Sequence, residues 1–504
     1  MKPWLLPLCL SGALVACERP PPPADTLRAA VPVLPPSWGD PFRAEVGPPI
    51  ATWSAMFDGL TRLDANGQIV PALAESWSSP DGKQWTFTLR QGLKFSDGTR
   101  ADAPAVAETF RWLMTKDGKA SVIGGRVRGL KTVETPDEQT LIIELSKPDA
   151  IFYKRLPAVM IVGADAWKRL GPVRFAKRPV GTGPYRLVRF DERGRKAILQ
   201  ANPHGWRKAG IAKLEIIELA DEAVRQQALI SGEIDVARVG LDGAPLMRAR
   251  GVDVVAAPAM TVMSMAFLID GQKGPLTDPR VRRALNYAVD KETLSRQLLG
   301  GRARPAGQPA ALGTTGYNPA IGAYAHDPAR ARALLAQAGY ARGFDLELAA
   351  MIGNMPSDAL IYQAVANDLS KVGVRARIRA VPYPVYLHNY ARNAWGSASG
   401  FGAAWQATPT NDVQRPMEGF SCLRKNTSFC DKALTARLTA ASKEMNVASR
   451  EALLQQVSLA YHDAAPALFL VEQVDVFGTS ARVEGLSLAN RTPVYERVRF
   501  KTKP

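Results

Sequence analysis

The sequence lacks the residue patterns that are typical of metal sites and of catalytic nucleophiles. Four histidines stand far apart in the 504 residues, in no metal-binding spacing, at positions 204, 326, 388 and 462. No H-E-x-x-H motif is present, and both Gly-Lys pairs lack the upstream glycine of a phosphate-binding loop. GTGPYR has Arg186 where a dinucleotide-binding loop needs its third glycine, and GSASG has Ala398 where a nucleophile elbow needs serine. The sequence therefore predicts no catalytic residues, no metal site and no cofactor.

Long apolar runs are also absent beyond the first residues of the chain. Lys2 is followed by a mostly apolar stretch from Trp4 to Val15, closed by Cys17, and this stretch is shorter than the roughly 20 residues that cross a membrane. A positive start, a short apolar run and small residues before a cysteine are typical of a lipoprotein export signal. We expect residues 1–16 to be a signal peptide, Cys17 to carry lipid, and residues 17–24 to form a Pro-rich spacer. The alternative is an ordinary signal peptide with a coincidental cysteine.

Cysteine is scarce, with four residues in all. Cys9 leaves with the expected signal peptide and Cys17 takes the lipid, so one pair remains, Cys422 and Cys430. In an oxidising compartment a pair at this spacing closes a local loop as a disulfide. Two free thiols are the first alternative. A zinc site is the second, and it would need four ligands where the sequence offers no nearby histidine.

The composition is that of a globular chain, with 46% hydrophobic and 22% charged residues. Its length is too great for one hydrophobic core and predicts two or three domains. A net charge of +17 would permit binding to nucleic acid or to an anionic membrane surface. Lysine and arginine are nevertheless spread through both halves with no block of five basic residues, so we expect diffuse surface charge and no nucleic-acid partner.

Strand and helix patterns alternate along the chain. In QWTFTLR, Trp85, Phe87 and Leu89 face one way and polar residues the other, and TLIIEL is a second strand pattern. Helices are expected to begin at Asp278 and Asp327, each an N-cap followed by proline at the first helical position. Strand patterns dominate residues 63–180 and helix patterns dominate residues 275–465. The alternation predicts an α/β architecture.

Several segments share one order with a known family. The longest is PALAESWSSPDGKQWTFTLRQGLKFSDGTRADAPAV at 71–106, which MFDGLTRLDANG precedes. The others follow in order: VGTGPYRL at 180–187, ANPHGW at 201–206, ALISGEIDVA at 228–237, PLTDPRVRRALNYAVDKETL at 275–294 and APALFLVEQ at 465–473. Together these segments resemble the family 5 extracellular solute-binding proteins, the peptide- and nickel-type receptors of bacterial ABC importers. The resemblance covers nearly all of the mature chain.

The resemblance implies a two-lobed periplasmic-binding-protein fold of type II, with an extra strand-rich subdomain inserted in the first lobe. The implied division is lobe I at 25–62, 180–270 and 467–504, the inserted subdomain at 63–179, and lobe II at 271–466. It also implies a monomer in the periplasm, held at the membrane by its lipid, that captures a peptide or other small organic solute and delivers it to an inner-membrane ABC permease. The alternative is an exported sensor or hydrolase on the same scaffold, for which no output domain or nucleophile–base set is found.

The segment GAAWQATPTND, residues 402–412, bears on the ligand. Peptide-binding members resemble one another in a W-x-x-D pattern whose acid pairs with the ligand's amino group; here Trp405 matches the aromatic residue and Thr408 stands in place of the acid. Dipeptide receptors also carry a carboxylate-binding arginine, and the corresponding residues 351–358 contain none. We therefore expect a ligand without an obligatory free amino terminus, or one that is not a peptide.

The expected ligand-binding residues are mostly aromatic or polar and neutral, as in pockets for small organic solutes. They are Trp405, Gln406, Thr408, Asn411, Asp412, Trp395 and Tyr383. Asp412 is the nearest acid and could replace the missing one if the loop is shifted. For Trp395 the alternative is packing within a lobe. His388 and His462 are expected to be structural rather than nickel ligands.

Overall fold

The computed structural model describes residues 25–502, with the exception of residues 36, 45–46, 242, 353–354 and 356. The side chains of Pro48, Tyr383 and Pro384 are also outside the description. The expected signal peptide, the expected lipidation site Cys17 and the spacer at 17–24 lie outside these residues. Across the part of the chain that is described, no helix is both long enough and apolar enough to cross a membrane.

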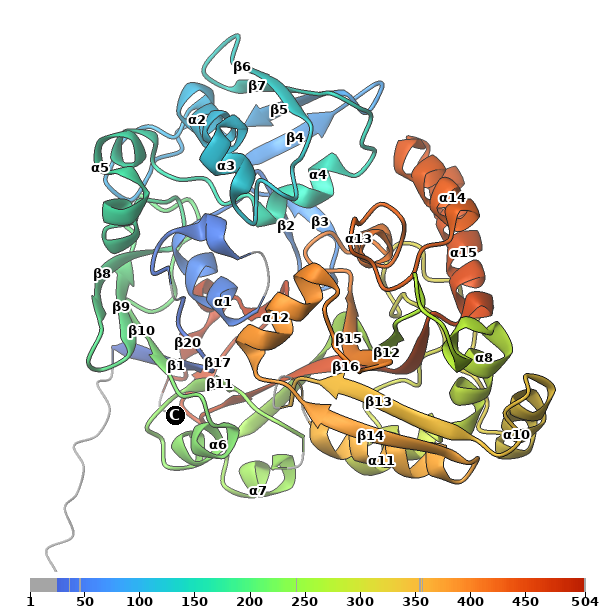
Figure 1. Cartoon of the computed structure of the whole chain (residues 1–504). Coiled ribbons are helices and arrows are strands. Elements are labelled where there is room, and N and C mark those ends of the chain that lie inside the picture. Colours follow the sequence, from blue (N-terminus) through green and yellow to red (C-terminus); the bar gives the residue numbers. More distant parts are fainter. Residues whose placement is uncertain are drawn as a thin grey trace, which may run out of the picture.

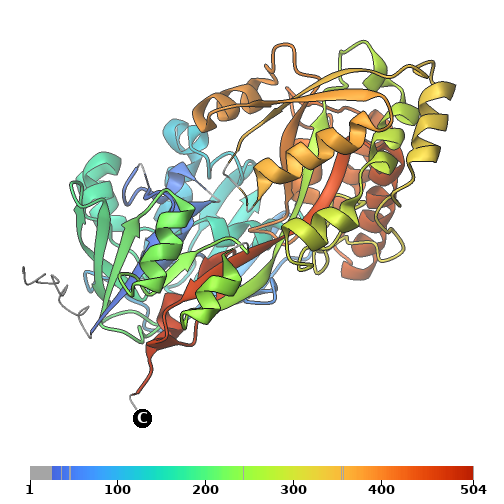
Figure 2. The same ribbon diagram turned by 90° about the horizontal axis from the view of Figure 1, so that it is seen from below.

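One ten-stranded sheet runs through the molecule (Figure 1). Its strands, in spatial order, are β14 (Val374–Ala380), β13 (Phe344–Ala350), β15 (Gly400–Gln406), β12 (Asp253–Phe267), β16 (Ala467–Thr479), β11 (Val236–Arg238), β1 (Thr26–Val31), β10 (Lys213–Glu218), β9 (Lys196–Ala201) and β8 (Tyr185–Asp191). The two longest strands, β12 and β16, are antiparallel neighbours, and Figure 2 shows them running from one half of the molecule into the other. The sheet therefore belongs to two α/β lobes joined by this strand pair, which confirms the expected fold class.

The partners of β12 and β16 change partway along their length. β12 pairs with β15 only from Thr261 onward, while the far end of β16 pairs with β11. The ladder between β12 and β16 is interrupted between Pro258 and Val262, and Met260 there has a φ of 50°. We refer to this interruption, between Pro258 and Val262, as the hinge. The expected lobe boundaries at 270 and 467 lie at the ends of these strands, and the division of the chain into lobes stays a prediction.

The strand-rich subdomain has its own four-stranded sheet. Its strands are β4 (Ala74–Ser78), β5 (Gln84–Leu89), β7 (Thr140–Leu145) and β6 (Leu130–Glu134), with helices α2 (Ala103–Met114), α3 (Lys116–Ala120) and α5 (Ala164–Lys177). Trp85, Phe87 and Leu89 are buried as their alternation predicts, because successive strand residues point to opposite faces. They join the same hydrophobic core as Tyr185 and Leu214, which lie in the expected lobe I, so the subdomain shares a core with that part of the chain.

Two further elements of the subdomain side reach toward lobe II. They are the hairpin β2 (Thr61–Leu63) and β3 (Ile69–Pro71), and the single-turn helix α4 (Phe152–Arg155). The remaining elements of lobe I are α1 (Pro48–Met56), α6 (Glu222–Ile230), α7 (Ala244–Ala249), and the short strands β17 (Val483–Glu484), β18 (Leu488–Ala489), β19 (Thr492–Pro493) and β20 (Arg499–Phe500).

Helices cover both faces of the lobe II half of the sheet. One face carries α8 (Pro279–Ala288), α10 (Pro328–Gln337) and α11 (Asp358–Ser370). The other face carries α13 (Gln414–Gly419), α14 (Lys432–Lys443) and α15 (Val447–Ala464). Helix α12 (Tyr383–Arg392) extends toward lobe I (Figure 1). The helix starts expected at Asp278 and Asp327 are confirmed, since each carboxylate accepts a hydrogen bond from a first-turn amide. The helix that begins after Asp278 is α8, and the short α9 (Lys291–Thr293) follows it.

Cys422 and Cys430 form the expected disulfide, with an S–S distance of 2.07 Å. The loop that it closes packs beside α12, where Asn393 Nδ2 donates to the carbonyl of Thr427 at 2.9 Å. His462 stacks on Tyr324 with ring centroids 4.2 Å apart. Among the described residues, no three His, Cys, Asp or Glu side chains gather as a metal site would require.

Candidate functional site

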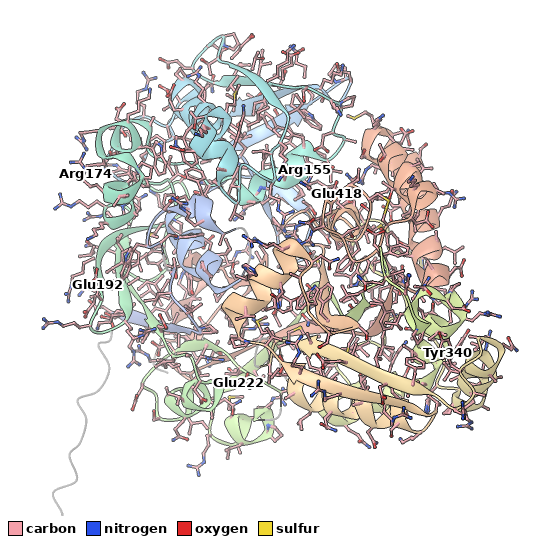
Figure 3. The ribbon with its side chains drawn as sticks, viewed as in Figure 1. Arg155, Arg174, Glu192, Glu222, Tyr340 and Glu418 are labelled. Carbon is pink, nitrogen blue, oxygen red and sulfur yellow. A yellow bond between two sulfur atoms is a disulfide. The ribbon has the colours of Figure 1, made fainter. Side chains whose placement is uncertain are left out.

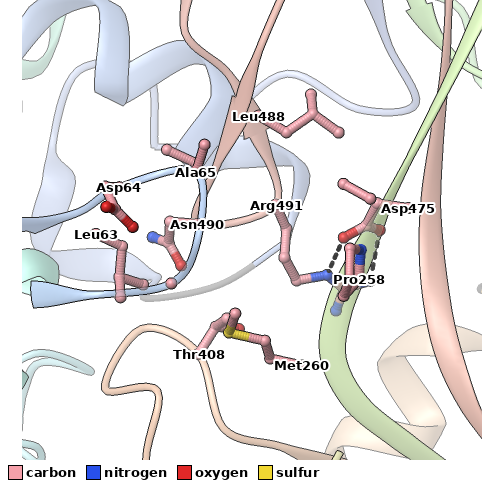
Figure 4. Close-up of a pocket in the computed structure, with 13 residues that line it drawn as sticks. Leu63, Asp64, Ala65, Pro258, Met260, Thr408, Asp475, Leu488, Asn490 and Arg491 are labelled. Carbon is pink, nitrogen blue, oxygen red and sulfur yellow. Dashed lines mark hydrogen bonds and ion pairs between the residues drawn. The ribbon is translucent and has the colours of Figure 1, made fainter. Parts of the chain in front are cut away.

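A small cavity, partly open to solvent, lies beside the hinge (Figure 4). Its walls come from the β2–β3 turn, the hinge residues of β12 and β16, the turn between β18 and β19, and the loop after β15. The lining residues are Leu63, Asp64, Ala65, Gly67, Ala257, Pro258, Met260, Thr408, Asp475, Leu488, Ala489, Asn490 and Arg491. Of the seven residues expected to bind ligand, Thr408 is the one in this lining.

Two of the charged groups that line this cavity, Asp475 and Arg491, are paired with each other. Asp475 is buried and bridges two arginines, at 2.9 Å to Arg238 and at 2.7 and 2.9 Å to Arg491. Burial raises the pKa of Asp475, but the charges of Arg491 and Arg238 and a hydrogen bond from Arg491 outweigh it and lower the pKa overall. The carboxylate of Asp64 accepts hydrogen bonds from two backbone amides of its own turn. Asp475 and Arg491 therefore neutralise each other, whereas Asp64 keeps its negative charge and is held by amide hydrogen bonds.

The loop from Ala407 to Val413 is anchored at both ends. The amide of Ala407 donates to the carbonyl of Met260 at 3.0 Å, and the amide of Val413 donates to Thr315 at 3.0 Å. Between them Asn411 adopts a φ of 46°, and its Nδ2 donates to the carbonyl of Gly67 at 2.7 Å. Gly67 itself has a φ of 74°, a conformation that favours glycine, and a Cβ there would displace the end of the Met260 side chain. The loop thus sits directly against the β2–β3 turn.

Trp405 and Trp395 lie inside lobe II. Trp405 is 1% exposed, stacks on Phe420 at 4.1 Å between ring centroids, and donates from Nε1 to Ser264 Oγ at 3.1 Å. Trp395 is 3% exposed and stacks on Phe401 at 4.2 Å. Neither ring lines the hinge cavity in this conformation. Their contact with ligand stays a prediction, and packing within the lobe, the alternative for Trp395, is what the structure displays.

Gln406 and Thr408 lie next to each other at the start of the loop that follows β15. Gln406 Nε2 donates to Thr408 Oγ1 at 2.9 Å, and the carbonyl of Gln406 accepts from Arg415 at 2.5 Å. Thr408 is 2% exposed and is one of the residues that line the cavity. The backbone of Tyr383 begins α12, and its side chain lies outside the described residues.

Asp412 is fully buried and held by two cations. It accepts from Arg450 at 2.7 and 3.0 Å, from Lys154 Nζ at 3.1 Å, and from the amide of Gln414 at 3.0 Å. Burial raises the pKa of Asp412, but the charges of Arg450 and Lys154 and these hydrogen bonds outweigh it and lower the pKa to about 2. Its charge is thus neutralised from within the protein.

Several residues of this region were not predicted from the sequence. Lys154 and Arg450 stand 258 and 38 residues from Asp412, and Arg491 meets Asp475 only because the chain returns through β18 and β19. No local motif marks these pairs. An excess of basic residues was visible, but it did not show which arginines and lysines are buried.

A hinge of two shared strands between two α/β lobes defines a binding protein that closes on a solute. The family model for bacterial extracellular solute-binding proteins, family 5, matches residues 68–426, and the chain belongs to that family. It is 30% identical to the glutathione-binding protein GsiB of Salmonella paratyphi A over 357 residues, 68% of this chain and 67% of that protein. It is 29% identical to heme-binding protein A of Haemophilus influenzae over 454 residues, 83% of this chain and 81% of that protein.

A solved structure supports the same fold. NikZ from Campylobacter jejuni, in complex with Ni(L-His), superposes with a TM-score of 0.80 at 23% identity, covering 95% of this chain and 100% of that one. The proteins that this chain resembles are binding proteins rather than enzymes. The chain is the solute-binding component of an ABC importer, which captures a solute and delivers it to a membrane permease.

Proposed function

We propose that the solute of this receptor is bound without an ion pair to a free amino group, at the hinge end of the interlobe cleft beside Thr408 and Gln406. The observation that carries the proposal is Thr408, a neutral residue that lines the hinge cavity in the position of the family's acid. Asn411 supports the same wall by tying the loop to the β2–β3 turn. Trp405 and Trp395 pack in the core of lobe II and stabilise this wall from within the lobe.

The charge balance of the loop favours a neutral contact. Threonine can accept a hydrogen bond from an ammonium group, but it cannot offset the several kcal/mol that a buried, unpaired cation costs. Asp412, the one acid of the loop, already faces Arg450 and Lys154, so a third cation beside it would meet net positive charge. An incoming amine would therefore find no uncompensated carboxylate in this loop.

The names of the relatives support leaving the ligand class open among organic solutes. GsiB is named for glutathione, heme-binding protein A for heme, and the NikZ structure holds a nickel–histidine complex. These ligands differ in charge, size and the presence of a free amino group. Family membership thus supports solute capture without choosing the solute.

A thermal-shift screen tests the proposal with di- to pentapeptides, their N-acetylated forms, oligosaccharides, heme and metal chelates. A bound solute at 100 times its dissociation constant stabilises the protein by about 2.7 kcal/mol, which is readily measured. We expect the best solute to act equally well when its amino group is blocked or absent. The variant Thr408→Asp is expected to gain a response to free dipeptides that the wild type lacks. The proposal fails if the wild type responds to free dipeptides and not to their N-acetylated forms.

We further propose that the mature chain begins at a lipidated Cys17 and remains at the membrane of the cell envelope. The support is the sequence before Cys17, together with membership of an extracellular family. Mass spectrometry of the N-terminal peptide is expected to find diacylglycerol on Cys17, and Cys17→Ser is expected to move the protein out of the membrane fraction. An unlipidated wild-type chain cleaved at another position would overturn this expectation.

A further inference from the structure

Helix α4 of the inserted subdomain presents two consecutive cations to acids of lobe II. Lys154 Nζ lies 3.1 Å from Asp412 Oδ2 and 3.0 Å from Thr315 Oγ1. Arg155 donates to Glu418 of α13 at 3.3 Å, and Figure 3 shows these two labelled side chains facing each other between α4 and α13. Just before the helix, the amide of Ala150 donates to the carbonyl of Ser442 in α14 at 3.1 Å. One short helix therefore supplies most of the polar contact across this interface.

The partners of these cations are arranged so that separation leaves no buried acid uncompensated. If the subdomain moves away, Asp412 keeps its two hydrogen bonds from Arg450. Arg155 keeps Asp149 at 2.7 Å, which belongs to its own subdomain. Removing one partner of an ordinary buried ion pair is costly because a charge is left unpaired. Here opening avoids most of that cost.

The remaining charged groups of this interface are also not left buried and unpaired when the subdomain moves away. Glu418 keeps a hydrogen bond from Gln414 Nε2 at 2.8 Å within lobe II. Within the described part of the chain, Lys154 donates hydrogen bonds to Asp412 and Thr315, which both lie in lobe II. Its ammonium group would return to water on opening, where a lysine is well solvated. The contact of Lys154 and Arg155 with lobe II thus stabilises the closed form, and breaking it costs little free energy.

We propose that Lys154, supported by Arg155, is a positioning residue that clasps the inserted subdomain to lobe II and sets the ratio of closed to open receptor. Asp412 lies four residues after Thr408 in one anchored loop, so the clasp fixes the ligand-facing loop in the same movement that closes the lobes. Hydrogen bonds between ionised partners, with water largely excluded, are stronger than neutral ones. The proposal rests on hinge closure alone and does not depend on which solute is bound.

Hydrogen exchange at the amide of Ala150 reports this equilibrium, because its partner Ser442 lies across the interface. In the full chain without added solute, Lys154→Met is expected to raise the exchange rate of that amide about tenfold, equivalent to losing one charge-assisted contact from the closed state. The amide of Leu145, which bonds to Lys83 within the subdomain, is expected to be unchanged. Small-angle scattering is expected to show a larger radius of gyration for the same variant.

Matched variants separate the clasp from general effects of charge. Lys131→Met removes the same charge from the same subdomain, but Lys131 pairs at 2.7 Å with Glu144 of that subdomain, so it is expected to leave both readouts unchanged. Lys154→Arg is expected to restore them. Glu418→Gln opens the clasp from the lobe II side and covers the case in which Lys154→Met folds poorly. Wild-type exchange and scattering in both Lys154→Met and Glu418→Gln would overturn the proposal.

Discussion

Replacing Asp412 with asparagine is expected to lower the free energy of unfolding by about 3–5 kcal/mol, the usual cost of breaking a buried ion pair by removing one partner. The amide would keep the shape of the side chain but leave Arg450, which is buried, without a counter-charge. Lys154 would lose its lobe II carboxylate as well. Denaturant unfolding followed by circular dichroism measures the difference from the wild type.

Asp345→Asn is the matched control for this prediction. Asp345 is also an aspartate paired with an arginine, Arg375, but its side chain is 81% exposed, so its loss is expected to have a much smaller effect. Equal losses in the two variants would contradict the prediction.

The pH dependence of the free energy of unfolding provides a second check that the charge of Asp412 stabilises the fold. The pKa of Asp412 is lowered to about 2 in the folded chain, below its usual value near 3.8, so its ionisation stabilises the fold above about pH 4. The difference between wild type and Asp412→Asn is expected to shrink as the pH falls from about 4 toward 2.

Removing the disulfide by Cys422→Ser and Cys430→Ser is expected to cost about 2–3 kcal/mol, the loop-closure entropy of so short a loop. The effect acts mainly on the unfolded chain, since the folded loop is also held by Asn393 and by the stacking of Arg424 on Tyr390 at 3.9 Å. Unfolding of the wild type with and without reductant gives an independent measurement. If alkylation without reductant labels both cysteines of the exported protein, the bond is absent and the prediction fails.

Local patterns in the sequence predicted the fold well. The burial of Trp85 and Phe87 follows from the twofold repeat of a strand, and the helix starts at Asp278 and Asp327 follow from capping that involves residues only two or three positions away. These features depend on neighbours in the chain. The two-lobed arrangement came from the resemblance to the family, because no local pattern specifies that β12 and β16 are shared.

The site could be predicted only in part, because its chemistry depends on partners distant in the chain. Thr408 was singled out from its place after Trp405, and it lines the hinge cavity, but that it contacts the ligand stays a prediction. An indole in a glycine-rich segment looks the same in sequence whether it faces a ligand or, like Trp405, stacks on Phe420. The charge state of Asp412 depends on Lys154, which no spacing rule connects to it.

The arrangement of β1, β11 and β16 also determines the order in which the protein can fold as it is made. Ala29 pairs with Val236, and Val236 pairs with Thr479, so the first strand of the chain and its last long strand flank the same short partner. The four strands of the inserted subdomain lie within residues 74–145 and can pair as soon as that segment emerges. Both lobes must instead wait for β16, which pairs with β11 in one lobe and with β12 in the other. The inserted subdomain can therefore form before either lobe is complete.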